Sequence, residues 1–349
     1  MAAPAAPAPR RTVLIASYLE QEYVERIARV EGVRVIYEPT LLPRPRYPMD
    51  HHGAPLRRSE REERRWREYL RQAEVLFDFD YTTPQGFADL APQVRWIQAT
   101  SAGIGQYLVR TELIRSPITF TTARGIHGVP LAEFVLLSML WFAKNGPRIA
   151  RDQAAHRWER TCAAELRGAT VGIVGFGGVG REVARTCRAL GLRVIATRRT
   201  ATAETTDGEA QRVLPPSHLP ALLREVDFLV LCAPLTPLTE RLIGPAQLAL
   251  MKPGAVLINI SRGAVVDEPA MSAALRSGHL GGAALDVAAE EPLPRESPLW
   301  DLPNVLISPH SASTVTTENA KLTDLFCENL RRYIGGSALL NVFDREHLY

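Results

Sequence analysis

The sequence contains only four cysteines among its 349 residues, and they lie far apart. Cys162, Cys187, Cys232 and Cys327 form no CxxC pair and have no histidine at the spacing of a zinc site. This pattern excludes a disulfide scaffold and a zinc module, and it is typical of isolated thiols in a reducing compartment. We therefore expect a cytoplasmic protein with no metal site.

The sequence also lacks an excess of one charge sign and a long apolar run. Its 41 basic and 38 acidic residues leave a formal net charge of +3, which argues against a nucleic-acid partner. The longest apolar stretch, residues 134–143, is shorter than the ~20 residues of a membrane helix, so we expect no membrane association. Residues 1–11 are rich in Ala and Pro and have no apolar secretory segment, and we expect a disordered tail there.

Short β-rich runs alternate with helical segments along the remaining chain. The length suits two domains, and this alternation predicts an α/β fold with parallel sheets. In the first half we expect strands at 12–16, 33–37, 75–79, 94–98 and 118–121. We expect helices at 20–30 and 56–73. A second and more regular series follows an apolar helix at 130–143, with strands at 170–174, 193–196, 228–232, 255–260, 282–287 and 305–308. A last helix is expected at 316–334.

A glycine-rich turn follows the first strand of the second series. Gly175, Gly177 and Gly180 have the GxGxxG spacing, between a β-branched strand and a helical pattern. The first glycine permits a tight turn, the second lets a pyrophosphate approach the backbone, and the third allows the helix to pack closely on the strand. In this setting the motif favours a dinucleotide site over a structural turn. The same turn would contribute Phe176, Gly178 and Val179.

The end of the next strand bears on which dinucleotide is bound. An NAD site usually places Asp or Glu there, whereas this sequence has Arg198, Arg199 and Thr200 and no acid. A guanidinium can hold a 2′-phosphate through paired charge-assisted hydrogen bonds, while a carboxylate would repel it. The two arginines could instead be solvated loop residues of an arginine-rich chain. The pattern favours NADP(H), with NAD(H) as the open alternative.

Three further polar residues follow strand ends of the second series. Arg262, Glu291 and His310 are an arginine, a carboxylate and a histidine, expected where such sheets bind ligands. Each has an ordinary alternative, as a salt-bridge partner, a loop charge or a hydrogen-bonded turn histidine. Their occurrence together in a dinucleotide-binding domain favours a catalytic set.

These motifs resemble those of the D-isomer-specific 2-hydroxyacid dehydrogenase family, in its glyoxylate/hydroxypyruvate reductase-like branch. The resemblance is carried by the glycine turn and by residues 232–239, 251–267, 285–294 and 298–310. It covers most of residues 130–312, whereas the first 125 residues match loosely through 101–105.

The resemblance implies two Rossmann-like or flavodoxin-like domains with the active site in the cleft between them. Residues 12–125 plus 310–349 would form a discontinuous substrate domain, and residues 126–309 would form the NAD(P)-binding Rossmann domain. The helix at 130–143 would be the connecting helix, with either a homodimer contact or a plain core role.

The family's catalytic set matches Arg262, Glu291 and His310. By this resemblance His310 would give a proton to the developing alkoxide, Glu291 would hold the imidazolium, and Arg262 would bind the substrate carboxylate and polarise the ketone. Backbone amides of Ala102, Gly103 and Ile104 would receive the same carboxylate, and Asp286 would orient the nicotinamide. The remaining coenzyme contacts implied are Cys232, Ala233, Pro234, Thr239, Ile260 and Ser261.

We therefore expect an NAD(P)H-dependent reductase of a small 2-oxo acid such as glyoxylate or hydroxypyruvate. An NAD-linked D-2-hydroxyacid dehydrogenase of the phosphoglycerate type is the alternative within the enzyme class. A dinucleotide-sensing interaction protein on the same fold is the alternative outside it.

Residues 41–65 form a longer and more polar connection than the family usually has. His51 and His52 could suggest a metal, but adjacent histidines point in different directions and no third ligand is apparent. The arginines that follow are interleaved with glutamates, which indicates i,i+4 pairs on a helix. The role of this segment is not readable from the sequence.

Overall fold

The computed structural model describes residues 10–83 and 85–349. Most of the expected tail, residues 1–9, therefore lies outside the described residues. Its expected limit at residue 11 is wrong, because Arg11 already belongs to the first strand. Its backbone N–H donates to the carbonyl of Gly32, and its guanidinium bonds Glu74 at 2.9 Å.

The chain forms two compact units. One contains the residues up to Ile126 together with Val315–Tyr349, and the other is His127–Thr314. The second boundary differs from the expected one, because residues 310–314 belong to the second unit. The backbone N–H groups of Ser311 and Ala312 both donate to Asp286 of that unit, at 2.9 Å each.

The first unit is built on a five-stranded parallel sheet with the order β2-β1-β3-β4-β5. Its strands are β1 (Arg11–Ile15), β2 (Val33–Ile36), β3 (Val75–Phe77), β4 (Trp96–Gln98) and β5 (Thr119–Thr121). Side chains alternate between two cores, as a strand period of two requires. Val13 and Ile15 face one core and Leu14 faces the other.

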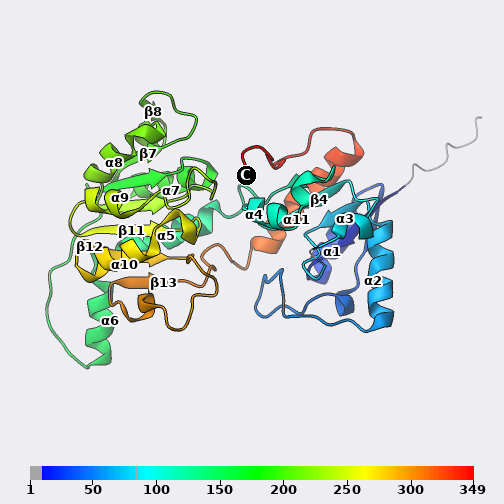
Figure 1. Ribbon diagram of the computed structural model, residues 1–349, viewed down its shortest axis with the longest axis horizontal. Coiled ribbons are helices and arrows are strands. Elements are labelled where there is room, and N and C mark those ends of the chain that lie inside the picture. The colour runs from blue at the N-terminus through cyan, green and yellow to red at the C-terminus, as the bar shows by residue number, and fades with distance from the viewer. Residues whose placement is uncertain (1–9, 84) are drawn as a thin grey trace, which may run out of the picture. The chain divides into compact units, whose positions relative to one another are not determined.

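Helices cover both faces of this sheet (Figure 1). They are α1 (Gln21–Ala28), α2 (Glu60–Gln72), α3 (Phe87–Leu90), α4 (Gly105–Arg110) and α11 (Glu318–Ile334). One core packs α1 and α11, and the other packs α2 and α4. The C-terminal helix therefore completes the first unit, where Tyr333 donates to Glu74 at 2.8 Å.

Helix α2 begins at Glu60 and not at the expected residue 56. Ser59 accepts a hydrogen bond from the backbone N–H of Glu62, and the Glu62 side chain accepts one from the backbone N–H of Ser59. This reciprocal cap fixes the first turn. The Ser-x-x-Glu spacing was the sequence signal for it.

The second unit contains an eight-stranded sheet with the order β13-β12-β11-β10-β6-β7-β9-β8. Its strands are β6 (Thr170–Val174), β7 (Arg193–Thr197), β8 (Thr205–Asp207), β9 (Ala210–Leu214), β10 (Phe228–Leu231), β11 (Ala255–Asn259), β12 (Leu280–Leu285) and β13 (Val305–Ile307). All neighbours are parallel except β8 and β9. The strand order reverses at β6, between β7 and β10, which is where such sheets bind dinucleotides. The expected α/β fold with two parallel sheets is confirmed.

Helices flank this sheet as well. They are α5 (Gly128–Ala143), α6 (Gly146–Ala154), α7 (Gly178–Ala189), α8 (Leu219–Glu225), α9 (Pro245–Leu250) and α10 (Glu268–Arg276). In the described part of the chain, no helix is both long and apolar enough to cross a membrane.

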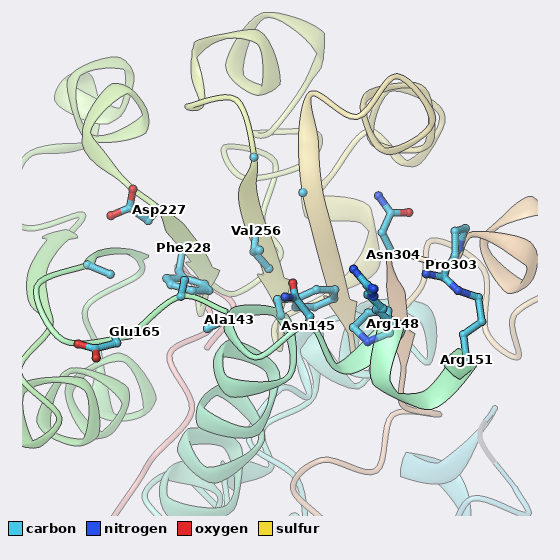
Figure 2. A pocket seen from close by; sticks show the side chains of 16 residues that line it. Ala143, Asn145, Arg148, Arg151, Glu165, Asp227, Phe228, Val256, Pro303 and Asn304 are labelled. Atoms are coloured by element: carbon cyan, nitrogen blue, oxygen red, sulfur yellow. The ribbon is translucent and has the colours of Figure 1, made fainter. Parts of the chain in front are cut away.

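A cavity of about 620 Å³ opens at the amino-terminal edge of this sheet (Figure 2). Phe228, Val256 and Asn304 contribute to it from the starts of β10, β11 and β13. Arg148 and Arg151 of α6 line its other side. Ligands of open parallel sheets bind at the carboxyl ends of the strands, so this cavity lies at the opposite edge from the expected site.

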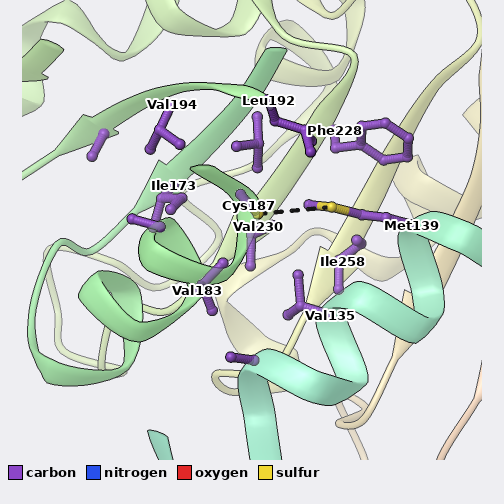
Figure 3. Close-up of a cluster of buried hydrophobic side chains, with 14 of the residues drawn as sticks. Val135, Met139, Ile173, Val183, Cys187, Leu192, Val194, Phe228, Val230 and Ile258 are labelled. Atoms are coloured by element: carbon purple, nitrogen blue, oxygen red, sulfur yellow. Dashed lines mark hydrogen bonds between the residues drawn. The ribbon is translucent and has the colours of Figure 1, made fainter. Parts of the chain in front are cut away.

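Helices α5 and α7 share one core with the sheet (Figure 3). Val135 and Met139 of α5 and Val183 and Cys187 of α7 are buried there together. The Cys187 thiol lies 4.0 Å from the Met139 sulfur, and burial raises its pKa to about 12. This cysteine therefore acts as a packing residue.

Candidate functional site

The glycine turn connects β6 to α7 in the way that the motif predicts. Gly175 has a left-handed φ of 99°, and a Cβ on it would lie 2.6 Å from the backbone nitrogen of Ala233. A Cβ on Gly180 would lie 2.3 Å from the Gly175 carbonyl oxygen. Only glycine fits these two positions, so the turn is tight and α7 packs directly on β6.

The middle of the same turn is open. A Cβ on Gly177 or Gly178 would meet no atom within 4 Å, and both residues are exposed at the start of α7. An exposed backbone at the amino end of a 12-residue helix is a ready site for an anionic group. Phe176 is buried under the turn, and Val179 is half-buried beside it. These residues fit a dinucleotide pyrophosphate.

The end of β7 presents Arg198, Arg199 and Thr200, and all three are exposed. The Arg198 backbone N–H donates to Leu214 of β9, which fixes this end to the neighbouring strand. The strand ends beside the glycine turn, because the Thr197 carbonyl accepts hydrogen bonds from Gly175 and Phe176. The three residues thus lie where the ribose next to a bound pyrophosphate would be expected.

An acid does occur close to this strand end, although not on β7 itself. Asp207 of β8 accepts a hydrogen bond from Arg181 at 2.8 Å, and Arg181 lies over the Phe176 ring at 4.7 Å. The backbone N–H of Glu209, the Arg181 guanidinium and the charge of Arg198 lower the pKa of Asp207. Asp207 was not predicted from the sequence, because the acid of an NAD site is expected at the end of β7 and Asp207 lies on β8.

The loop after β10 lies against the glycine turn. The Cys232 backbone N–H donates to Val174 at 2.8 Å, and Ala233 contacts Gly175 as described above. The Thr239 hydroxyl donates to the Pro234 carbonyl at 2.6 Å and accepts from the backbone N–H of Thr236 at 2.8 Å. These bonds hold the loop in one conformation. Burial raises the pKa of Cys232 well above its usual value, so it is a neutral thiol there.

Strand β11 is followed by Ile260, Ser261 and Arg262. Ile260 and Ser261 are buried, and both the backbone N–H and the hydroxyl of Ser261 bond the Asn259 side-chain oxygen, at 3.0 and 2.8 Å. The Arg262 guanidinium donates to the Ser261 carbonyl at 2.7 Å. Asn259 therefore shapes the turn that presents Arg262, and it was not singled out from the sequence.

Asp286, after β12, anchors the turn after β13. It is buried, and its Oδ1 accepts hydrogen bonds from the Ser308 hydroxyl at 2.7 Å and from the backbone N–H groups of Ser311 and Ala312. Its backbone carbonyl accepts from the His310 N–H at 2.8 Å. Asp286 thus encloses the histidine turn on both sides. Ser308, like Asp207 and Asn259, was not singled out from the sequence.

His310 sits in that turn with a left-handed φ of 55°. A histidine in this region is held against its own preference, and such strain is common at functional sites. Its Nδ1 lies 2.7 Å from Oε2 of Glu291, and the other Glu291 oxygen accepts from the Ala288 N–H at 3.1 Å. Both side chains are exposed at the carboxyl edge of the sheet. The imidazole is therefore oriented by one carboxylate through Nδ1, and Nε2 is the ring nitrogen that does not face Glu291.

Electrostatics connect Glu291, His310 and Arg262. Burial raises the pKa of Glu291, but the hydrogen bond and charge of His310, the Ala288 N–H and the charge of Arg262 together bring it below its ordinary value. Burial lowers the pKa of Arg262, while Glu291 and Asp286 oppose that change. The structure thus brings Arg262, Asp286, Glu291 and His310 into one group. A cation, an oriented imidazole and a dinucleotide turn on one sheet can support hydride and proton transfer to a carbonyl.

The expected carboxylate loop belongs to the first unit. Ala102 and Gly103 are exposed after β4, and Ile104 is buried at the start of α4. The carbonyl of Ser101 accepts from the Ala123 N–H at 3.1 Å, which fixes the beginning of the loop. The loop therefore offers its backbone at the carboxyl edge of the smaller sheet.

Neither histidine of the 41–65 segment lies in a metal cluster. Among residues 10–83 and 85–349, no group of three or more His, Cys, Asp or Glu could hold a metal ion. His51 is buried between Ser17 and Asn319, and His52 stacks on Tyr81 with 4.1 Å between ring centroids.

The larger part of the second unit matches a known protein family. Residues 136–312 match the family model described as "D-isomer specific 2-hydroxyacid dehydrogenase, NAD binding domain". This range contains the glycine turn, Arg262, Glu291 and His310.

Two curated relatives extend the match beyond that domain. A (S)-sulfolactate dehydrogenase of Chromohalobacter salexigens is 36% identical over 67% of this chain and 76% of its own. A glyoxylate reductase of Aeropyrum pernix is 41% identical over 73% of this chain and 78% of its own.

A solved structure matches almost the whole chain. An NADPH-dependent glyoxylate/hydroxypyruvate reductase from Sinorhizobium meliloti, in complex with NADP and sulfate, superimposes with a TM-score of 0.78 at 25% identity. The match covers 97% of this chain and 100% of that one.

Proposed function

The chain belongs to the D-isomer-specific 2-hydroxyacid dehydrogenase family and is an NAD(P)-dependent oxidoreductase of 2-hydroxy acids, and we propose that it works as an NADPH-preferring glyoxylate/hydroxypyruvate reductase. The observation that carries this proposal is the 2.7 Å hydrogen bond between His310 and Glu291 at the carboxyl edge of a dinucleotide-binding sheet.

The dinucleotide would be held by residues from four strand ends. Gly177 and Gly178 would offer their backbone to the pyrophosphate, and the wall of the site across the β6–β10 switch point would be formed by Cys232, Ala233, Pro234 and Thr239. Ile260 and Ser261, which follow β11, would continue this wall, and Asp286 would orient the carboxamide. When bound, the nicotinamide supplies the hydride that reduces the keto carbon.

His310 would act as the proton donor. Its Nδ1 faces Glu291, so Nε2 is the nitrogen left to protonate the substrate oxygen. The ionised Glu291 stabilises the protonated imidazole and fixes the ring orientation. The left-handed backbone at His310, enclosed by Asp286, would keep this geometry before the substrate arrives.

Arg262 would bind the substrate carboxylate and polarise the keto oxygen. Its guanidinium carries fixed donors and is half-buried, which strengthens its interaction with an anion. Backbone amides of Ala102, Gly103 and Ile104 would receive the same carboxylate. Charge that develops on the oxygen in the transition state would then be stabilised by Arg262.

The preference for NADPH is proposed from the end of β7. Arg198 and Arg199 are exposed there, and the nearby acid, Asp207, is already bonded by Arg181. Two guanidinium groups beside a neutralised acid favour a 2′-phosphate over a 2′-hydroxyl. The S. meliloti reductase named above has NADP in its structure.

We further propose a cytoplasmic homodimer. Exposed apolar side chains lie along α5, with Val129 at 49%, Leu137 at 55% and Leu140 at 39% exposure. A second copy could cover this face, and light scattering would measure the mass directly. The four cysteines are free thiols, as in proteins of a reducing compartment.

The deciding experiment follows the absorbance of reduced coenzyme with glyoxylate, hydroxypyruvate and phosphohydroxypyruvate. We expect oxidation of NADPH with the first two acids to be faster than that of NADH. Turnover only with phosphohydroxypyruvate and NADH would instead identify a phosphoglycerate-type dehydrogenase. One relative of this chain is named D-3-phosphoglycerate dehydrogenase. Binding of NADPH without turnover of any 2-oxo acid would contradict the proposed reductase.

A further inference from the structure

The 41–65 segment contains a loop that is hydrogen-bonded around Asp50 and that the proposed reaction has not yet used. Asp50 is buried, and its carboxylate accepts bonds from the Arg46 guanidinium at 2.7 and 3.1 Å and from the backbone N–H groups of Arg46, His52 and Gly53. Gly53 has a φ of 66°, and a Cβ on it would lie 2.5 Å from Pro43. The loop is thus closed on itself around one carboxylate.

His51 attaches this loop to the rest of the first unit. Its Nδ1 lies 3.0 Å from the Ser17 hydroxyl after β1, and its Nε2 lies 2.9 Å from Oδ1 of Asn319 in α11. Asn319 in turn donates to Glu20 at 2.8 Å. The buried His51 is therefore an anchor, and the next residue, His52, is the one left at the surface.

The His52 ring packs on Tyr81, which is in turn hydrogen-bonded to Asp78. Its ring stacks on Tyr81 at 4.1 Å with an interplanar angle of 28°. The Tyr81 hydroxyl donates to Oδ1 of Asp78 at 3.2 Å and also interacts with the Thr100 side chain. Asp78 is fully buried with a φ of 68°, and its Oδ2 has no hydrogen-bond partner among the described residues.

This cluster lies at the functional edge of the smaller sheet. The strand order 2-1-3-4-5 has its switch point between β1 and β3, and Ser17 and Asp78 follow those two strands. Thr100 leads into the exposed loop at Ala102 and Gly103, and Tyr81 packs at 5.4 Å on Tyr107 of α4, just after that loop. The His52 ring and the proposed carboxylate loop are therefore neighbours within one unit.

The charges around His52 point to one kind of ligand. Arg46, Asp50 and Asp78 are the charged groups near it. Arg46 and Asp50 neutralise each other through their double hydrogen bond, so among the described residues Asp78 is the acid near His52 that has no ion-pair partner. A second anionic group on a substrate would be repelled there, whereas a hydroxyl could exchange hydrogen bonds with the imidazole.

We propose that His52, stacked on Tyr81, binds the hydroxyl on the carbon next to the keto group, and that Asp78 selects against acids with a second negative group at that carbon. The chain would then prefer hydroxypyruvate to pyruvate, oxaloacetate and 3-sulfopyruvate. This inference rests on the proposed reductase function. It names the hydroxyl next to the keto group as the substrate feature that the site recognises.

The test compares kcat/KM for glyoxylate, pyruvate, hydroxypyruvate, oxaloacetate and 3-sulfopyruvate in the full chain with NADPH. His52→Phe keeps the stack on Tyr81 and removes the ring nitrogens. Its kcat/KM for hydroxypyruvate should fall about threefold to tenfold. Glyoxylate has no carbon beyond the keto group, so its value should stay within about twofold. His218→Phe, an exposed histidine of the other unit, is the matched control and should change neither value.

Asp78→Asn removes the charge at constant size and should raise the ratio of oxaloacetate to hydroxypyruvate turnover. An equal loss for glyoxylate and hydroxypyruvate in His52→Phe would overturn the subsite and leave the reductase function standing. A wild-type preference for 3-sulfopyruvate over hydroxypyruvate would also overturn the subsite. Absence of turnover with all five acids would overturn the reductase function itself.

Discussion

The two parallel sheets carry their functional groups in different ways. In the larger sheet Arg262, Asp286 and His310 follow the ends of β11, β12 and β13, so these side chains are placed by the strands themselves. In the smaller sheet the candidate group His52 comes from a loop that is held by a buried carboxylate and a buried histidine. Strand ends place residues that a motif can reveal, whereas a loop places them through partners that are distant in sequence.

The largest expected effect tests whether the larger sheet carries the chemistry. His310→Ala should lower kcat for reduction by ~10²–10⁴, because the oriented proton donor is lost. Its Kd for NADPH, measured by fluorescence titration, should stay within about twofold. His218→Ala is the control at an exposed position of the same unit. Undiminished turnover in His310→Ala would move the proton transfer to another group.

Substitutions at the end of β7 should change the affinity for the coenzyme. Replacing Arg198 and Arg199 by Ala should weaken NADPH by ~10–100-fold and leave NADH within about threefold, because the lost charges face only the 2′-phosphate. Arg224 and Arg276, exposed arginines of the same unit, provide the matched double variant. Equal weakening of both coenzymes would refute the phosphate clamp.

Glu291→Gln should change the pH profile and not only the rate. Because the pKa of Glu291 lies below its ordinary value, the wild-type carboxylate is ionised over about pH 5–8 and does not limit reduction there. Glutamine cannot stabilise a protonated imidazole, so kcat/KM should fall about tenfold at pH 8 and less at pH 6. A uniform loss across that range would mean that Glu291 only positions the ring.

A substitution in the loop of the smaller unit should change the stability of the protein. Asp50→Asn should lower the free energy of unfolding in urea at pH 7 by about 2 kcal/mol, because the Arg46 guanidinium loses its buried partner. Burial opposes ionisation of Asp50, but Arg46 and the backbone N–H groups hold its pKa well below the usual range. A depressed carboxyl pKa contributes stability above its unfolded value near ~4 and loses it at lower pH.

The difference between Asp50→Asn and wild type should therefore shrink as the pH falls below about 4. Asp89→Asn, an exposed acid of the same unit, should be neutral at both pH values. A constant difference from pH 7 to pH 3 would show that the carboxylate charge is not what closes the loop.

Most of the larger sheet could be predicted because its signals are local. Gly175 and Gly180 are required by contacts within a few residues or with the adjacent strand. The missed hairpin of β8 and β9 lies in a polar segment, and its Asp207–Gly208 pair was the turn signal available. Helix α6 was missed for a similar reason, because its exposed side leaves few apolar positions.

The smaller sheet could be predicted as a fold but not as a site. Its strands have apolar runs that sequence reveals, whereas His51 depends on Asn319, 268 residues further along the chain. No spacing rule connects two such residues. The stacking of His52 on Tyr81 likewise depends on how the Asp50 loop closes, which only the packed structure determines.

The position of α11 also has a consequence for synthesis of the chain on the ribosome. The unit His127–Thr314 has all its strands before α11 is made, so it can complete its core first. The N-terminal sheet has to wait for Phe326 and Leu330, which fill one of its faces. Although most of its residues emerge first, this unit is finished last, and its uncovered apolar face is the surface that a chaperone would meet.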